Sequence, residues 1–528
     1  MKKLLYFILF FSLLLPFNLY SQPQLEWAKT YNSAGMQDDN FVDMKIDGHG
    51  NTYITGYTIV SSSNYDIVTM KYSSSGNLEW VKTYDGMLHD FDSPVGIEID
   101  KAGYIYVSGT TKDSIESKRE YLLLKYNTEG NLIWKKKYNN SVDTIDNYNN
   151  AHKMVIDNTG NIFITGEGGG HGISVPPGIV TIKVDSSGNK LWTRYFKSVA
   201  PATDMVSAIS IDSQGNIFIA GGSPGIGGLM IKYNSIGDSI FTKTSYFISG
   251  NKIFNLTDQN IILAAGNGLI KCDSTGNIIW SRVFRNPFSS EDFQVDQTLN
   301  IYAAGSVALS SGSKYVTVKF NYNGDSLWSR SYQAFANSYN IPTSIAIDKN
   351  QKIYVSGYVE KNQFSIRFLT VKYSQDSTFN WAIQYNNGIE FSDYEAKRIL
   401  LDSAGNIYLA GISKTSGTDI TLIKYSQQTS ITHVFDKIPQ KFNLSQNYPN
   451  PFNPETKIHY DLSKTSFISL NIYNSLGRKI SSLVNKLQPA GNYTVNFNSN
   501  DFNLPSGIYF YIISFGEILI TKKMILVK

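Results

Sequence analysis

Aspartate is the residue whose spacing in this chain first suggests chemistry. It recurs once per repeat at a turn-like position: Asp47, Asp100, Asp157, Asp212, Asp296, Asp348 and Asp402. A catalytic site needs particular groups that converge on one point, whereas these carboxylates occupy the equivalent position of successive repeats. An aspartate side chain can accept a hydrogen bond from the backbone two residues on and so begin a tight turn. The series therefore predicts turn capping.

A second series of short polar residues precedes the first by eight positions. Its members are Asp39, Asp92, Asn149, Asp204 and Asn340. They fall where the innermost strand of each repeat should begin, so they could form a broken polar ring at the mouth of a central channel. Oxygen ligands of this kind suit a hard cation such as Ca²⁺. Asp39, Asp92 and Asp204 are thus the candidate metal ligands, although capping of the strand starts, with no ion, is the preferred interpretation.

Motifs that mark an enzyme are missing from the sequence. The histidines are His49, His89, His152, His171, His433 and His459, and no pair has metal-ligand spacing. We find no Walker loop or His-Glu-x-x-His. The glycine-rich runs 166–172 and 221–228 precede strand-like rather than helix-like segments, so we interpret them as loops. No catalytic or cofactor-binding residue is predicted, and the lone Cys272 is interpreted as a strand filler.

The elements that carry these residues are pairs of hairpins. Residues 211–221 read Ile-Asp-Ser-Gln-Gly-Asn-Ile-Phe-Ile-Ala-Gly, and similar stretches recur along most of the chain. Asp and Gly make the turn between two short β-rich runs, and a closing glycine is expected to end the second strand. A second hairpin follows, with a lysine in its first strand and an aromatic residue in its second. Four antiparallel strands in roughly 40–60 residues are the size of a β-propeller blade.

Three series of markers count the blades. The closing glycines are Gly56, Gly109, Gly166, Gly221, Gly266, Gly305, Gly357 and Gly411. The lysines are Lys71, Lys125, Lys183, Lys232, Lys271, Lys319, Lys372 and Lys424. The aromatics are Trp27, Trp80, Trp134, Trp192, Phe241, Trp280, Trp328 and Trp381. We predict an all-β, eight-bladed propeller, with seven blades as the alternative if the short fifth repeat merges with a neighbour. Trp27 precedes the first hairpin, so the strand 25–31 should close the last blade and remove two exposed sheet edges.

The two chain ends differ from the repeats. Residues 1–22 combine two lysines, a short apolar run and a polar exit, which predicts a secretory signal peptide. The propeller should span 23–429, and a linker 430–441. We expect no transmembrane segment, because no apolar stretch approaches about 20 residues. The formal charge of +4 is spread along the repeats, which argues against nucleic-acid binding.

Residues 442–528 should form about six short strands in a small immunoglobulin-like β-sandwich. Their motifs include Asn447-Tyr448-Pro449-Asn450-Pro451-Phe452, Gly477, Gly491, Gly507, and the terminal Lys522, Lys523 and Lys528. In this order they resemble the C-terminal sorting domain of the type IX (Por) secretion system. The resemblance implies export by the type IX machinery to a secreted or surface-attached state, with surface lipopolysaccharide as a further partner. The propeller repeats similarly resemble the bacterial SBBP-type β-propeller repeats, a family without a single activity.

Loop length indicates where function lies. Turns within hairpins are nearly constant, whereas the connections on the opposite face vary, notably 84–93, 138–150, 166–177 and 332–342. Variable loops on a rigid scaffold commonly carry recognition. We therefore expect a binding or adhesion protein that recognises a glycan or a protein. The alternatives are a secreted polysaccharide lyase or glycosidase with its site at the channel mouth, and a structural surface component.

Overall fold

The computed structural model describes residues 22–528 apart from 35–36, 62–63, 113–118, 140–148, 170–175, 200–201, 226, 246–249, 266–267, 285–287, 363–364, 389–392, 416, 428–441, 464–465, 489–490 and 516–517. The chain forms two compact units, Met1–Gln428 and Thr429–Lys528. Residues 1–21 of the predicted signal peptide and the whole predicted linker lie outside the described residues. No helix in the described part of the chain is long and apolar enough to cross a membrane.

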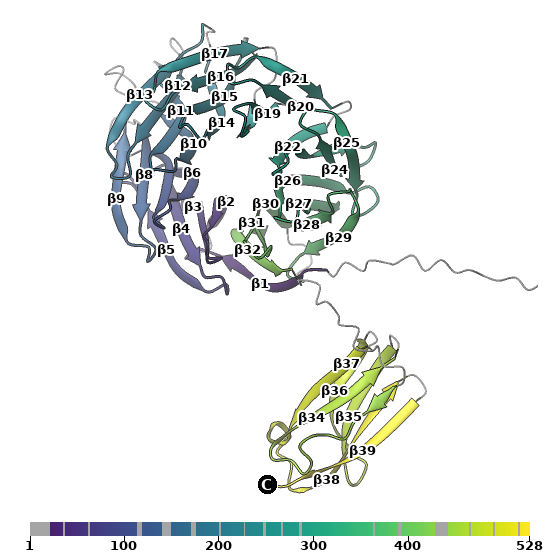
Figure 1. Cartoon of the computed structure of the whole chain (residues 1–528). Coiled ribbons are helices and arrows are strands. Elements are labelled where there is room, and N and C mark those ends of the chain that lie inside the picture. The colour runs from purple at the N-terminus through teal and green to yellow at the C-terminus, as the bar shows by residue number, and fades with distance from the viewer. Residues whose placement is uncertain are drawn as a thin grey trace, which may run out of the picture. The chain divides into compact units, whose positions relative to one another are not determined.

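The first unit is a propeller of eight four-stranded blades (Figure 1). The innermost strands are β2 (Asp38–Ile46), β6 (Asp92–Ile99), β10 (Asn150–Ile156), β14 (Met205–Ile211), β18 (Gly250–Asn255), β22 (Phe288–Val295), β26 (Tyr339–Ile347) and β30 (Asp393–Leu401). The second strands are β3 (Thr52–Ile59), β7 (Ile105–Thr111), β11 (Ile162–Gly168), β15 (Ile217–Ser223), β19 (Ile261–Ala265), β23 (Ile301–Ala308), β27 (Ile353–Asn362) and β31 (Ile407–Lys414).

The outer half of each blade follows in the same order. The third strands are β4 (Tyr65–Tyr72), β8 (Glu120–Tyr126), β12 (Gly178–Val184), β16 (Gly227–Tyr233), β20 (Gly268–Cys272), β24 (Ser313–Phe320), β28 (Ser365–Tyr373) and β32 (Thr418–Ser426). The outermost strands are β5 (Leu78–Tyr84), β9 (Leu132–Tyr138), β13 (Lys190–Phe196), β17 (Ser239–Ser245), β21 (Ile278–Val283), β25 (Ser326–Tyr332), β29 (Phe379–Tyr385) and β1 (Gln24–Tyr31). The seven-bladed alternative is wrong, because β18–β21 form a four-stranded sheet of their own.

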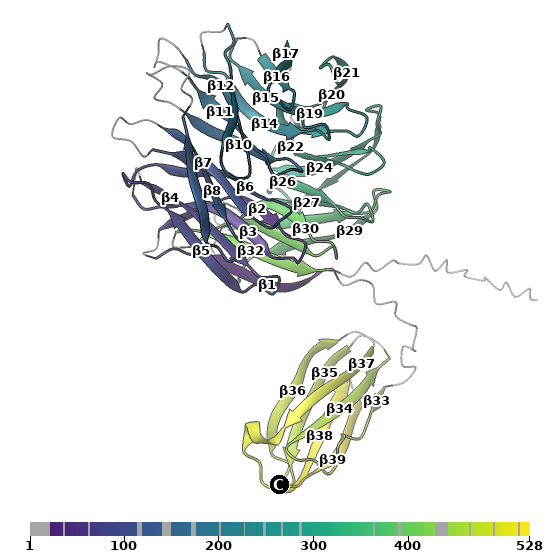
Figure 2. The same cartoon turned by 60° about the vertical axis from the view of Figure 1, so that its left-hand side comes forward.

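The ring is closed by its first strand. β1 pairs antiparallel with β32, from Gln24 opposite Ser426 to Tyr31 opposite Ile420, and both views show it beside the last blade (Figures 1 and 2). The indole of Trp27 and the ammonium of Lys424 both donate to the carbonyl of Ser74 in the first blade. The two ends of the propeller therefore satisfy each other's sheet edges, as closed β structures require.

The repeated lysines and aromatics join each blade to the next. Lys125 Nζ donates to the carbonyl of Ser186, 2.8 Å away, in a turn of the following blade. Lys71 and the indole of Trp80 share the carbonyl of Thr128 in the same way. The aliphatic part of each lysine packs in the sheet, while its ammonium donates to a carbonyl of the next blade. This hydrogen bond satisfies a carbonyl whose burial would otherwise be costly. These markers are therefore blade-to-blade contacts.

The closing glycines have a different role from the one expected. Gly221 lies inside β15 rather than at its end, opposite Val206 and beside a β-bulge in β14. A Cβ on Gly221 would lie 1.9 Å from the carbonyl oxygen of Met205. Gly56, Gly109, Gly166, Gly357 and Gly411 meet the same obstacle at 1.9–2.4 Å. Glycine recurs here because the bulge brings two backbones too close for any side chain. Gly266 of the fifth repeat lies outside the described residues.

The propeller core lies between neighbouring blades. Second and third strands are almost fully buried, and each hydrophobic cluster draws on two adjacent blades, as with Phe163 and Ile219. Cys272 is buried in one such cluster, and burial raises the pKa of its thiol to about 12. This agrees with a packing role for the cysteine.

The second unit is a β-sandwich (Figure 2). One sheet contains β33 (Asn443–Leu444), β34 (Glu455–Leu462) and β37 (Gly491–Asn498). The other contains β36 (Lys479–Gln488), β35 (Ser466–Asn474), β38 (Gly507–Phe515) and β39 (Ile518–Leu526), and a short 3₁₀ helix, η1 (Ser499–Phe502), follows β37. A core of its own, which includes Ile458, Leu470 and Tyr511, fills the space between the sheets. Alternation of buried and exposed residues along β34 is the pattern of a strand with one buried face.

Candidate functional site

A pocket of about 370 Å³ lies in the central channel of the propeller, where the innermost strands face one another. Every innermost strand has a β-bulge at the same level, which displaces the ladder by one residue. The residues that follow the bulges occupy equivalent positions around the channel, and we call them the post-bulge ring. The ring is Asp43, Gly96, Lys153, Ala208, Lys252, Asp292, Ser344 and Arg398.

Charged side chains line this pocket, and most of them are paired. Lys45 contacts Glu98 at 2.9 Å across the first two blades. Lys252 contacts Asp292 at 2.5 Å and also donates to the carbonyl of Phe293. Arg398 Nε lies 3.8 Å from a carboxylate oxygen of Asp43. Ion pairs in a concave site are less screened than surface pairs, so they fix the shape of the channel wall.

Two groups in the pocket have displaced pKa values. Burial raises the pKa of Glu98, although Lys45 opposes that shift through charge and hydrogen bonding. Burial lowers the pKa of Lys153; Asp43 opposes the shift, and the positive charge of Arg398 adds to it. Lys153 is in contact with solvent in the channel but surrounded by protein, which explains how an accessible ammonium can be desolvated. Groups of this kind cluster at binding and catalytic sites.

The predicted metal ligands do not face this pocket. Asp39, Asp92 and Asp204 are at most 1% exposed, and each accepts a hydrogen bond of 2.6–2.7 Å from the backbone N–H six residues earlier. Asn340 does the same at 3.0 Å. Each side chain therefore closes the connection that enters its own strand. This geometry supports the capping interpretation, and the described lining of the pocket does not include these residues.

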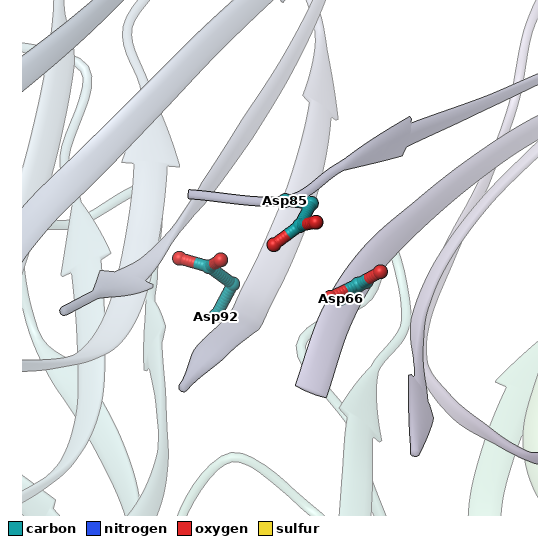
Figure 3. Close-up of side chains that lie close together, drawn as sticks. All are labelled: Asp66, Asp85 and Asp92. Atoms are coloured by element: carbon teal, nitrogen blue, oxygen red, sulfur yellow. The ribbon is translucent and has the colours of Figure 1, made fainter. Parts of the chain in front are cut away.

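One predicted metal ligand does belong to a carboxylate cluster. Oxygens of Asp66, Asp85 and Asp92 lie within 4.8 Å of one another, where β4 and β5 meet the start of β6 (Figure 3). Burial, followed by the nearby charge of Asp85, raises the pKa of Asp66 to about 6. Like charges at this separation repel, so a proton or a cation would stabilise the cluster.

The first aspartate series caps turns, as predicted. In all seven repeats one carboxylate oxygen accepts the backbone N–H groups two and four residues on, at 2.8–3.0 Å. In blade five Asp258 is placed in the corresponding turn and accepts from Asn260. These aspartates hold the face of the propeller that carries the tight turns.

Of the four predicted recognition loops, 84–93 and 332–342 are fully described, whereas 140–148 and 170–175 lie outside the described residues. Loop 84–93 lies beside an aromatic group: Tyr57 packs on Tyr65, and Tyr65 on Phe91, with centroids 5.6 and 5.5 Å apart. The guanidinium of Arg119 lies over the Phe91 ring at 4.7 Å. We call these four residues, with the three aspartates of the cluster, the loop-face patch.

In the sandwich, the sorting-motif residues hold the last strand in place. Asn447 is buried and donates to Thr456 and to the carbonyl of Pro449, while Asn450 accepts from the N–H of Ile525. Phe452 is buried and exchanges backbone hydrogen bonds with residues 525 and 527. Tyr448 is 78% exposed. Between Asn447 and Phe452, Pro449 and Pro451 follow cis peptide bonds.

The remaining motif residues lie at turns and along β39. Gly477 closes a turn with φ +77°, and Gly491 and Gly507 begin β37 and β38. Lys522 and Lys523 lie in β39, and the backbone N–H of Lys528 donates to Ser506.

Comparisons with known proteins assign the second unit and the fold of the first. Residues 446–528 match the family model described as a secretion system C-terminal sorting domain. No curated protein matches the chain. Among solved structures, the Dos1 propeller covers 77% of this chain and 96% of its own, with 8% identity and a TM-score of 0.52. A streptogramin B lyase covers 63% and 93%, with 13% identity and a TM-score of 0.39.

Two conclusions follow from these comparisons. The sorting domain indicates export by type IX secretion and a secreted or cell-surface location. The Dos1 likeness shows the propeller fold alone.

The sequence reasoning missed the channel residues. Lys153, Glu98 and Arg398 belong to no series, because their counterparts in other repeats are of different types. Alignment of the repeats on the closing glycine would have revealed Lys153 and Arg398, since each ring residue pairs with the position just before that glycine, as Lys153 does with Thr165 and Arg398 with Ala410. A position that varies in charge within an otherwise regular repeat was the available signal.

Proposed function

We propose that the secreted propeller is a binding or adhesion module that recognises a glycan or a protein partner through its loop face. The observation that supports this most is the loop-face patch at the junction of the first two blades. It combines half-buried aromatic rings and an arginine with the carboxylate cluster, of which Asp85 is exposed and Asp92 is buried.

The chemistry of the patch suits a polar ligand. Carboxylates accept hydrogen bonds from hydroxyl and amide donors, and aromatic rings offer a flat apolar surface with few rotatable bonds. The adjacent loop presents Met87, which is 80% exposed, and Leu88, so that a ligand would meet both polar and apolar groups. Sites that combine apolar area with a few placed polar groups are typical of ligand recognition.

The test is binding of the full-length chain to a glycan array and to extracted surface proteins, with and without a calcium chelator. Asp85→Asn should reduce the signal about tenfold, because it removes a charged acceptor from the patch. Asp325→Asn, an exposed aspartate on the opposite, turn-bearing face, is the matched control and should leave binding unchanged. Equal binding by both variants would contradict recognition at this patch, and loss of binding with the chelator would support a cation between the carboxylates.

A second candidate function, cleavage of a polysaccharide, is favoured by one observation. Glu98 and Lys153 are unlike titratable groups that line the same pocket, and the pKa of one is raised while that of the other is lowered. Such a pair resembles a general acid and base. Release of reducing or unsaturated chain ends by the full-length chain, abolished by Glu98→Gln, would favour this function.

A further inference from the structure

The channel pocket is asymmetric because two positions of the post-bulge ring, on either side of Lys153, have very small side chains. On either side of Lys153 the ring positions are Gly96 and Ala208, its two smallest residues. A Cβ on Gly96 would have as its nearest neighbour a carboxylate oxygen of Asp43 at 3.7 Å, so the space at this ring position, next in order to Lys153, is open. A pocket of about 370 Å³ is of the size that holds small organic ligands.

Two of the four cationic side chains in this pocket, Lys153 and Arg398, have hydrogen-bond donors without an acceptor among the described residues. Lys45 and Lys252 are each paired with a carboxylate at hydrogen-bond distance. By contrast, no described residue accepts a hydrogen bond or lies within ion-pair distance of Lys153 Nζ. Arg398 Nε is buried without a hydrogen-bond partner, since Asp43 is 3.8 Å away. Buried donors without acceptors are costly, so an acceptor that entered here would be favoured.

The charges are divided across the channel. Asp43, Lys45, Glu98, Lys153 and Arg398 interact electrostatically with one another, and three cations against two carboxylates leave that side at +1 when all are ionised. Lys252, Glu291 and Asp292 on the other side of the pocket sum to −1. An oxyanion would therefore be attracted to the first side, and hydroxyl or amine donors to the second.

We propose that this pocket binds an acidic sugar of monosaccharide size, or the end of an acidic glycan, with its oxyanion between Lys153 and Arg398. The hydroxyl groups of the same sugar face Glu291 and Asp292. The proposal does not depend on recognition at the loop-face patch, because the residues of the two sites are different.

The test is calorimetric titration of the full-length chain with D-glucuronate, with glucose 6-phosphate and with glucose. Binding of either acid, with glucose at least about tenfold weaker, is the expected result, since glucose lacks the charged acceptor. The two acids distinguish a carboxylate from a phosphate as the preferred oxyanion. No binding of either acid, or equal binding of glucose, would overturn the proposal.

Variants localise the site. Lys153→Gln and Arg398→Gln should each weaken binding of the acid by about tenfold or more. Lys101→Gln, at an exposed turn, is the matched control and should bind within about twofold of the parent chain. Gly96→Val should abolish binding by filling the open space at Gly96, the ring position next to Lys153. Full affinity in Lys153→Gln or Gly96→Val, with the fold verified by circular dichroism, would place the ligand elsewhere and overturn the assignment.

Discussion

The turn end and the middle of each innermost strand differ in how their residue types vary from blade to blade, although only a few residues separate the two positions. At the turn, seven of the eight blades have aspartate, and each makes the same two backbone hydrogen bonds. In the post-bulge ring the equivalent residues are Asp, Gly, Lys, Ala, Lys, Asp, Ser and Arg. Repetition marks positions that the backbone requires, because every blade has the same turn. Variation at a position fixed by the fold marks a surface that the backbone leaves free for a ligand.

The largest expected effect at a repeated position is that of Trp280→Ala. Trp280 is 9% exposed, donates to the carbonyl of Tyr322 and covers Gly324 of the next blade. Loss of this packing should lower the free energy of unfolding by about 3–5 kcal/mol. Trp280→Phe keeps a ring in place and should cost clearly less. Urea denaturation measures both, and equal losses would show that the indole N–H rather than packing joins the blades.

Gly411→Ala tests the glycine opposite the bulge. Its Cβ would lie 2.0 Å from the carbonyl oxygen of Glu395, so the backbones must separate. We expect a loss of about 1–3 kcal/mol, typical of overpacking. Gly48→Ala is the control, because a Cβ there meets nothing within 4 Å. A Gly411→Ala protein as stable as this control would contradict the close approach at the bulge.

Asp296→Asn tests a turn cap through its pH dependence. Burial alone would raise the pKa of Asp296, but hydrogen bonds from Asn300, Thr298 and Tyr302 outweigh it and hold the pKa below the usual range. A lowered pKa in the folded state gives stability that is present above the unfolded pKa of about 3.9 and is lost as the pH falls through the lower, folded value. The parent chain should exceed the variant by about 1–2 kcal/mol at neutral pH, and by less in acid. A stability difference that does not change with pH would exclude the charged cap.

Lys153→Gln should have the smallest effect on stability. It is the most direct test of the difference between the repeated turn positions and the variable post-bulge ring. The residue forms no ion pair with any described group, and its charge is desolvated, so its removal should change the free energy of unfolding by less than about 0.5 kcal/mol. The same variant should lose the acidic sugar. A large destabilisation, measured in the same urea series, would make Lys153 a structural residue like those at the turns.

Much of the architecture was accessible from the sequence because it depends on local chemistry that repeats. Asp212 and Gly215 specify one turn wherever they recur, so the hairpins could be predicted and counted. Because Trp27, an aromatic of the outermost-strand series, precedes the first hairpin, the sequence predicted that β1 completes the last blade. The strands of the sandwich follow the alternation of their residues. The closing glycine was misinterpreted, because its role is an approach between two strands that the sequence pattern does not express.

By itself, the sequence determined the blade repeat, the turn caps and the sorting domain, since each arises from residues close together in the chain. Only the tertiary structure decided what lies in the channel. Asp43, Lys153 and Arg398 come from β2, β10 and β30, far apart in the chain, and the closed ring of eight bulged strands brings them to one level. Their charges act on one another across space, so neither the free donors nor the lowered pKa of Lys153 can be deduced from residue spacing.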